Sequence, residues 1–233
     1  MNGWESSAQA WIDFVDHGDP NRVYVIDPAI RKALGPVRDL QVLDVGCGEG
    51  RFCRELAAQG ADTVGIDPVL GLIEVARRRG GTYLRADAAQ LPLKSDTFDL
   101  TLSILSLIDI YEFRTAILEM ARVTRPGGRV IVANINSFAT ANTTGWIKDE
   151  VGKRLMFPID NYMEERGDEV HWAGITVVNF HRPMSAYMQA FLKAGLRLMS
   201  YEELVPTENV AGMEDHWRMP YFHLMCWEKP VHL

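Results

Sequence analysis

The feature that most constrains the fold is a glycine-rich turn that directly follows a short apolar segment. Residues 42–45 contain a single polar side chain and lead into residues 46–50, where glycine occupies every second position. Residues 51–59 then have a helical pattern that Gly60 closes. Glycines in such a turn permit backbone conformations that a Cβ forbids, and they let a ligand approach the backbone. The segment predicts a strand–turn–helix unit, in which the turn either binds a ligand or is purely structural.

Short apolar segments and amphipathic helical patterns alternate through most of the chain. Such alternation predicts a parallel sheet with helices on both faces. Strands are expected at 41–45, 63–66, 82–85, 98–105, 130–135, 196–204 and 222–227. Helices are expected at 51–59, 69–79, 113–121 and 184–194. The predicted class is therefore α/β, with a Rossmann-like, seven-stranded and mostly parallel sheet in a single domain spanning residues 1–233.

Two segments lie outside this alternation. Apolar side chains in the first turns of the chain share one helical face, which predicts an amphipathic N-terminal helix within residues 1–38. Residues 136–182 are too long for a simple connection between a strand and a helix. Their second half predicts a hairpin that turns at Ala173 and Gly174. We interpret both segments as covers over a substrate site.

Charge and cysteine content restrict the partners and the setting. The chain has 24 basic and 31 acidic side chains and a formal net charge of -7. This balance makes nucleic acid an unlikely main partner, because duplexes are usually met by a basic face. No apolar stretch is long enough to span a bilayer. The three cysteines fit neither a metal site nor a disulfide framework, so the sequence predicts a cytoplasmic protein without a metal.

Acidic side chains around the turn indicate the kind of ligand. Asp67 ends the second expected strand about 20 residues after Gly46, a position suited to ribose hydroxyls, although an Asp before a proline is also a common helix-capping turn. Asp44 and Glu49 flank the turn and would repel a diphosphate, whereas they suit an ammonium or sulfonium group. The spacing also departs from the dinucleotide fingerprint, and no Tyr-x-x-x-Lys pair is present. An NAD(P)-linked oxidoreductase is therefore disfavoured.

Several motifs in order resemble those of the class I S-adenosylmethionine-dependent methyltransferases. Leu-Asp-Val-Gly-Cys-Gly-Glu-Gly at 43–50 resembles their first motif, and Gly-Ile-Asp-Pro at 65–68 resembles their acidic second-strand motif. Residues 85–93 are similar to the adenine-contacting segment. Residues 98–107 resemble the fourth strand beside the transferred methyl, and 123–128 resemble the turn before the fifth strand.

The resemblance implies S-adenosyl-L-methionine as the cofactor and assigns its contacts. The methionine part is assigned to Asp44, Gly46, Cys47 and Gly48, with Arg22 or Tyr24 as a hypothesis for the carboxylate. The ribose is assigned to Asp67, and the adenine to Pro68, Val69, Asp87 and Ala88. Ser103 and Ile104 are expected beside the sulfonium.

The predicted activity is methyl transfer to an oxygen, nitrogen or carbon atom of a small-molecule acceptor. A general base is needed only if the acceptor must lose a proton. His181, His171 and one of Glu164 and Glu165 are the candidates, with a histidine bonded to backbone as the structural alternative for His181. A protein or RNA acceptor and a non-catalytic S-adenosylmethionine-binding module remain alternatives. The acceptor, the methylated atom and the oligomeric state are not determined by the sequence.

Overall fold

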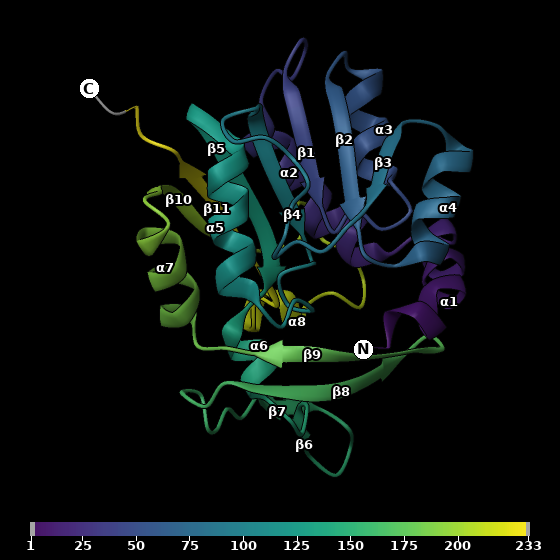
Figure 1. Ribbon diagram of the computed structural model, residues 1–233. Coiled ribbons are helices and arrows are strands. Elements are labelled where there is room, and N and C mark those ends of the chain that lie inside the picture. Colours follow the sequence, from purple (N-terminus) through teal and green to yellow (C-terminus); the bar gives the residue numbers. More distant parts are fainter. Residues whose placement is uncertain (1–2, 232–233) are drawn as a thin grey trace.

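A single seven-stranded sheet organises the computed structural model, which describes residues 3–231. The strand order across the sheet is β10-β11-β5-β4-β1-β2-β3 (Figure 1). The strands are β1 (Gln41–Val45), β2 (Asp62–Asp67), β3 (Thr82–Arg85), β4 (Phe98–Ile104), β5 (Thr124–Ile135), β10 (Arg197–Leu204) and β11 (Phe222–Glu228). Strand β11 pairs antiparallel with β5 and β10, and the other neighbours pair in parallel. The predicted mostly parallel, Rossmann-like sheet is confirmed.

Helices cover both faces of this sheet. Helices α5 (Phe113–Val123) and α7 (Met184–Lys193) bury their apolar sides against one face, together with Leu43 and Val45. Helices α2 (Asp27–Leu34) and α3 (Arg51–Ala58) pack with Val42 against the other face. Helix α4 (Leu70–Arg79) lies beside β2 and β3 (Figure 1). The alternation of Val42, Leu43 and Val45 between two cores follows from the two-residue period of a strand.

The central strands are apolar because both of their faces are covered. Strand β4 has one half-buried residue, Asp99, and is otherwise buried. Continuous burial of this kind is typical of parallel strands between two helical layers. Strands β1, β2, β3 and β4 run in the same direction, so their carboxyl ends lie along one edge of the sheet.

The segments interpreted as covers lie at this edge. Helix α1 (Trp4–Asp16) is followed by a short π-helix, η1 (Arg22–Ile26). Strands β8 (Arg166–Trp172) and β9 (Ile175–His181) form a separate two-stranded ribbon that crosses beneath the sheet in Figure 1. The ribbon turns at Ala173 and Gly174, both with positive φ, of 46° and 78°, at the expected position. That residues 1–38 and 136–182 act as covers remains a proposal.

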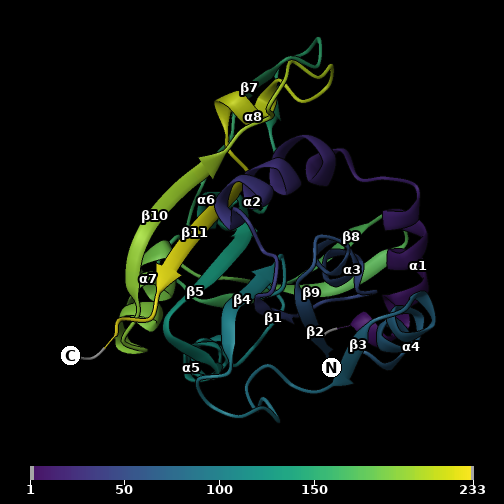
Figure 2. The ribbon, with the colours of Figure 1, turned by 90° about the horizontal axis from the view of Figure 1, so that it is seen from above.

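Besides η1 and α2, which follow the expected N-terminal helix, four short elements were not expected from the sequence. They are α6 (Ser137–Ala141), β6 (Ile147–Lys148), β7 (Arg154–Met156) and α8 (Asp215–Arg218). Each has five residues or fewer, too few for a hydrophobic period to be visible. Strand β7 and α8 project together from the body of the molecule in Figure 2. Within residues 3–231, no helix combines the length and apolar character needed to cross a membrane.

Candidate functional site

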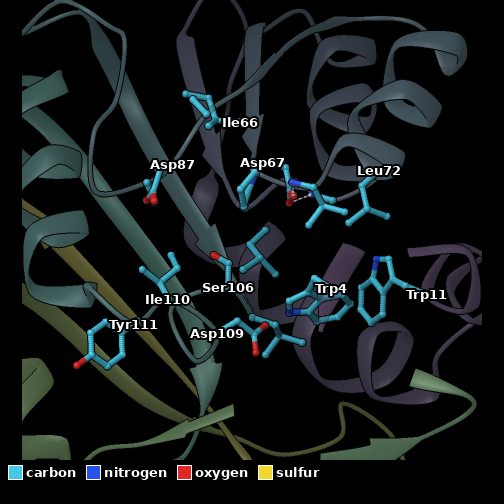
Figure 3. Close-up of a pocket in the computed structure, with 18 of the residues that line it drawn as sticks. Trp4, Trp11, Ile66, Asp67, Leu72, Asp87, Ser106, Asp109, Ile110 and Tyr111 are labelled. Carbon is cyan, nitrogen blue, oxygen red and sulfur yellow. Dashed lines mark hydrogen bonds between the residues drawn. The ribbon is translucent and has the colours of Figure 1, made fainter. Parts of the chain in front are cut away.

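A cavity of about 680 Å³ lies at the carboxyl edge of the sheet (Figure 3). Its sheet side is formed by the residues that end or follow β1, β2, β3 and β4, including Gly46, Asp67, Asp87 and Ser106. Its other walls come from α1, η1, and β9. Open α/β sheets bind ligands in this position, beyond the carboxyl ends of neighbouring strands. The cavity therefore brings together residues that lie between Trp4 and Phe180 in the chain.

The glycine turn packs closely against its neighbours, and its backbone amide groups are mostly paired within the protein. Gly46 has a φ of 78°, and a Cβ at this position would lie 2.3 Å from Cβ of Ser106. The amides of Gly46 and Cys47 both donate to the carbonyl of Ile66, at 2.7 and 2.9 Å. The turn consequently presents few unpaired N–H groups, which a diphosphate-binding turn would require.

Asp67 connects this turn to the wall of the cavity. Its two carboxylate oxygens accept hydrogen bonds from the amides of Gly48, at 3.0 Å, and Val69, at 2.9 Å. Burial raises the pKa of Asp67 to about 6, despite these two hydrogen bonds. The bond from Val69 is the helix-capping turn that the sequence left as an alternative. A carboxylate has about four lone-pair sites, so Asp67 can also accept hydrogen bonds from a ligand in the cavity.

Asp44 lies behind the turn, and is not part of the cavity wall. Its side chain is buried, and Oδ1 has no hydrogen-bond partner among the described residues. Burial is the main reason why its pKa is raised to about 7, and the charge of Asp67 acts in the same direction. A nearby cation would lower this pKa again and stabilise the carboxylate.

Arg22 supplies a guanidinium group to the same end of the cavity. It lies 4.8 Å from the ring centroid of Trp11 and 3.8 Å from a carboxylate oxygen of Asp19. Its Nε has no hydrogen-bond partner within the part of the chain that the structure describes. Burial, followed by the charge of Arg51, lowers its pKa. A buried guanidinium with an unpaired donor is suited to a carboxylate ligand.

Comparisons with known proteins agree with this architecture. A family model described as a methyltransferase domain matches residues 43–132. An S-adenosylmethionine dependent methyltransferase from Mesorhizobium loti superposes with a TM-score of 0.79 and 30% identity, covering 86% of this chain and 96% of that chain. The chain belongs to the class I S-adenosylmethionine-dependent methyltransferases.

Other members of the family are similar over different lengths. A Listeria monocytogenes protein assigned provisionally to these methyltransferases has a TM-score of 0.80 and 27% identity, covering 88% of this chain and 96% of that chain. Demethylmenaquinone methyltransferase from Clavibacter sepedonicus is 34% identical over 114 residues, which is 47% of this chain and 46% of the relative. The chain thus spans about half the length of the curated relatives it matches. The family membership confirms S-adenosylmethionine as the expected cofactor.

The site contains groups that fit this methyltransferase cofactor. Arg22 lines the cavity and complements the carboxylate of a methionine moiety, while the buried carboxylate of Asp44 behind the turn complements its ammonium group electrostatically. Glu49, which the sequence suggested as a second negative charge at the turn, instead forms ion pairs with Arg54 and Arg79 at 2.6 and 2.9 Å. The negative character of the turn therefore comes from Asp44 and Asp67.

Most of the residues assigned to the cofactor line the methyltransferase cavity. They are Arg22, Gly46, Gly48, Asp67, Pro68, Val69, Asp87, Ala88 and Ile104. Asp87 is exposed, and one carboxylate oxygen accepts a hydrogen bond from the amide of Ala89 at 2.8 Å. Their contacts with S-adenosylmethionine remain proposals.

Besides Asp44, two residues assigned to the cofactor, Cys47 and Ser103, do not line the cavity. The thiol side of Cys47 packs against a small core that includes Cys53 and Tyr83. Ser103 is fully buried, and its Oγ lies 2.6 Å from Oγ of Ser106. Ser106, three residues further along the chain, lines the cavity and donates to the carbonyl of Val45 at 2.7 Å.

The structure places neither candidate histidine in the cavity. His181 is buried, with Nδ1 2.7 Å from Oγ1 of Thr140 and Nε2 2.9 Å from the carbonyl of Tyr162. His171 is exposed, and its Nδ1 lies 3.0 Å from Oγ1 of Thr176. These contacts match the structural alternative for His181. A catalytic role for either histidine stays a prediction that the geometry does not favour.

Asp109 is an acidic group in the cavity that the sequence analysis missed. It follows β4, and its amide donates to the carbonyl of Ser106 at 2.9 Å. Burial raises the pKa of its carboxyl to about 8. The sequence does contain a feature that could have indicated Asp109. It is the single charged residue between Asp99 and Glu112, in an otherwise apolar stretch. Trp4, Trp11, Tyr111 and Phe180 add aromatic walls that were not assigned either.

Proposed function

We propose that this protein transfers a methyl group from S-adenosylmethionine to a small-molecule acceptor bound in the same cavity. One observation carries the proposal. A single cavity of about 680 Å³ joins the glycine turn and Asp67 to the region lined by Asp109, Tyr111 and Phe180. Cavities of this size hold cofactors and small ligands.

The two ends of the cavity suit different tasks. S-adenosylmethionine, when bound, supplies an electrophilic methyl group on a positively charged sulfur. In the proposed complex Asp67 orients the nucleoside and Arg22 the amino acid, and Figure 3 shows Ser106 between Asp67 and Asp109. Alignment of two reactants in one site accounts for a large part of such catalysis, on the order of 7–11 kcal/mol for well-oriented partners.

Helix α1 and strand β9 contribute by excluding water. Ser7 of α1 and Thr176 of β9 exchange two hydrogen bonds, at 3.0 and 3.1 Å. Trp4 of α1 and Phe180 of β9 both face the cavity. A dry site strengthens electrostatic interactions with the reacting groups and limits side reactions.

A small acceptor is supported by the charge of the walls. The described residues that line the cavity include four carboxyl groups, Asp67, Asp87, Asp109 and Glu112, and one cation, Arg22. Such a lining disfavours phosphate-rich acceptors, RNA among them. The relative from Clavibacter sepedonicus is named for demethylmenaquinone, which also supports a small-molecule acceptor.

Titration calorimetry with S-adenosylmethionine and S-adenosylhomocysteine tests the cofactor end. Asp67→Asn should weaken both ligands by about 1–3 kcal/mol, because the variant loses charge-assisted hydrogen bonds to the ribose. Asp62→Asn, an exposed residue at the opposite end of β2, is the matched control and should leave affinity unchanged. Absence of binding to the wild-type protein would refute the proposal.

The acceptor class is tested with radiolabelled S-adenosylmethionine and a cell extract separated by size. Label in the small-molecule fraction supports the proposal. Label in the protein or RNA fraction would favour those acceptors instead. Cofactor binding without any label transfer would indicate a non-catalytic binding module.

A further inference from the structure

Asp109 lies in a wall of the cavity that is mostly apolar and aromatic. Ile110, Tyr111, Val178 and Phe180 line the same region. The rings of Tyr111 and Phe180 are 5.6 Å apart. In Figure 3, Asp109 lies below Ser106 and next to Trp4, away from Asp87. A flat apolar ligand would pack well in this region, but it would leave a carboxyl group in an apolar environment unless it also carried a polar group.

The position of Asp109 is fixed by the hairpin and by α1. Its Oδ1 accepts a hydrogen bond from Nδ2 of Asn179 at 2.5 Å, and the indole N–H of Trp4 also donates to the carboxylate. The amide of Phe180 donates to the carbonyl of Ile108 at 2.7 Å. These contacts join the segment after β4 to β9, so the carboxyl group cannot turn away from the cavity without breaking several hydrogen bonds.

Arg182, which does not line the cavity, holds the same segment. Its guanidinium donates to the carbonyls of Leu107, at 2.9 Å, and Ile110, at 2.6 Å. The guanidinium also lies over the ring of Phe113, 4.2 Å from its centroid. Arg182 is therefore a positioning residue for Asp109, because it fixes the backbone on either side of it.

We propose that the acceptor is a planar, largely apolar molecule with a ring hydroxyl, and that Asp109 takes the proton of this hydroxyl. This inference rests on the proposed methyl transfer and names its acceptor class. The O–H bond breaks while the oxygen–carbon bond forms, the bonding pair of the donor stays on its sulfur, and the proton passes to a carboxylate oxygen of Asp109. The carboxyl group then releases the proton to solvent.

Charge and chemistry favour a hydroxyl over other acceptor groups. An anionic acceptor would meet the four carboxyl groups of the lining. An ammonium group has no free electron pair and would be stabilised in that form by a carboxylate. A ring hydroxyl titrates near pH 10, close enough to a carboxyl of raised pKa for proton transfer to be effective.

The groups around Asp109 determine how the site depends on pH. Burial and the charge of Asp67 raise the pKa of Asp109, while the hydrogen bonds from Asn179 and Trp4 and the charge of Arg182 lower it. The resulting value of about 8 means that the carboxylate becomes the main form only above neutral pH. Affinity for a hydroxyl donor should therefore rise with pH.

The test measures ligand binding to the protein saturated with S-adenosylhomocysteine. The probe is 2-naphthol, and its methyl ether, 2-methoxynaphthalene, is the matched ligand without a proton to donate. Calorimetry at about pH 6.5 and about pH 8.5 should show an affinity for 2-naphthol that rises about fivefold or more, since 2-naphthol remains neutral in this range. The affinity of the wild-type protein for 2-methoxynaphthalene should not depend on pH. The affinity of the Asp109→Asn variant for 2-naphthol should not depend on pH either. Asp62→Asn should behave as the wild type.

Several results would overturn the inference. These are the absence of 2-naphthol binding, a pH-independent affinity in the wild type, a rise that persists in Asp109→Asn, and tighter binding of tryptamine, an ammonium probe. Binding of 2-naphthol and tryptamine to the wild-type protein can refute the inference without any variant, so the test holds even if Asp109→Asn does not fold. Intact binding of S-adenosylhomocysteine in these experiments would confine the failure to the acceptor class, whereas its absence would refute the proposed function itself.

Discussion

His223 should make the stability of this protein sensitive to mild acid. It lies in β11, between β5 and β10, and is fully buried. Neither ring nitrogen has a hydrogen-bond partner in the region from residue 3 to residue 231. The ring stacks on Tyr201 at 5.5 Å. Burial without a partner disfavours the charged imidazolium, and it lowers the pKa of His223 from 6.5 to about 4.

The direction of the effect follows from proton linkage. Because the folded pKa lies below the unfolded one, the unfolded chain binds more protons between about pH 6.5 and about pH 4. Above about pH 6.5, His223 does not lower the free energy of unfolding. As the pH falls from about 6.5 to about 4, protonation of the unfolded chain lowers the free energy of unfolding. At about pH 4.5 the loss amounts to about 2 kcal/mol, since each unit of pKa difference corresponds to about 1.4 kcal/mol.

Urea unfolding at about pH 7 and about pH 4.5 provides the measurement. His223→Phe keeps an aromatic ring but cannot be protonated, so it should lose about 2 kcal/mol less than the wild type between the two pH values. The exposed His171→Phe is the control and should lose as much as the wild type. Buried Asp44, Asp67 and Asp109 act in the opposite direction, but they are common to all three proteins. Equal losses in the wild type and His223→Phe would refute this reasoning.

Two further predictions concern the cofactor end of the cavity. Gly46→Ala should weaken S-adenosylhomocysteine at least about tenfold in calorimetry, because a left-handed conformation costs an L-residue about 1–2 kcal/mol and the new Cβ meets Ser106. Adding Ser106→Gly should recover part of the affinity, and no recovery would mean that the contact is not the cause. Arg22→Gln should weaken S-adenosylmethionine by about 1.5–3 kcal/mol while leaving adenosine affinity unchanged; an equal loss for both ligands would place Arg22 away from the methionine carboxylate.

The sheet and the glycine turn at its carboxyl edge were predictable because they depend on local patterns. The apolar run of β4, the glycine turn and the acid that ends β2 each follow from a few adjacent residues. The same is true of the hairpin turn, where Ala173 and Gly174 mark the change of direction. Local periodicity and turn chemistry are the strongest signals in a single sequence.

The acceptor end could not be predicted, because its contacts join distant segments. Asp109 is held by Asn179 of the hairpin and Trp4 of α1, and no spacing in the sequence indicates these pairs. His181 was chosen because it follows the hairpin, but the register of β9 directs its ring to Thr140 and Tyr162. Successive side chains of a strand point to opposite faces. A shift of one residue in register therefore decides whether a given side chain faces the cavity or points away from it.

The two-stranded ribbon outside the main sheet has a consequence for the evolution of this protein. Val178 and Phe180, two residues apart on β9, reach into the cavity, while neither is part of the cores that hold the sheet together. Exchanging these two side chains alters the shape offered to an incoming molecule without disturbing the seven central strands. Substitutions in this peripheral β-ribbon can thus change which molecules fit the cavity while the glycine turn and the acid that ends β2 stay the same.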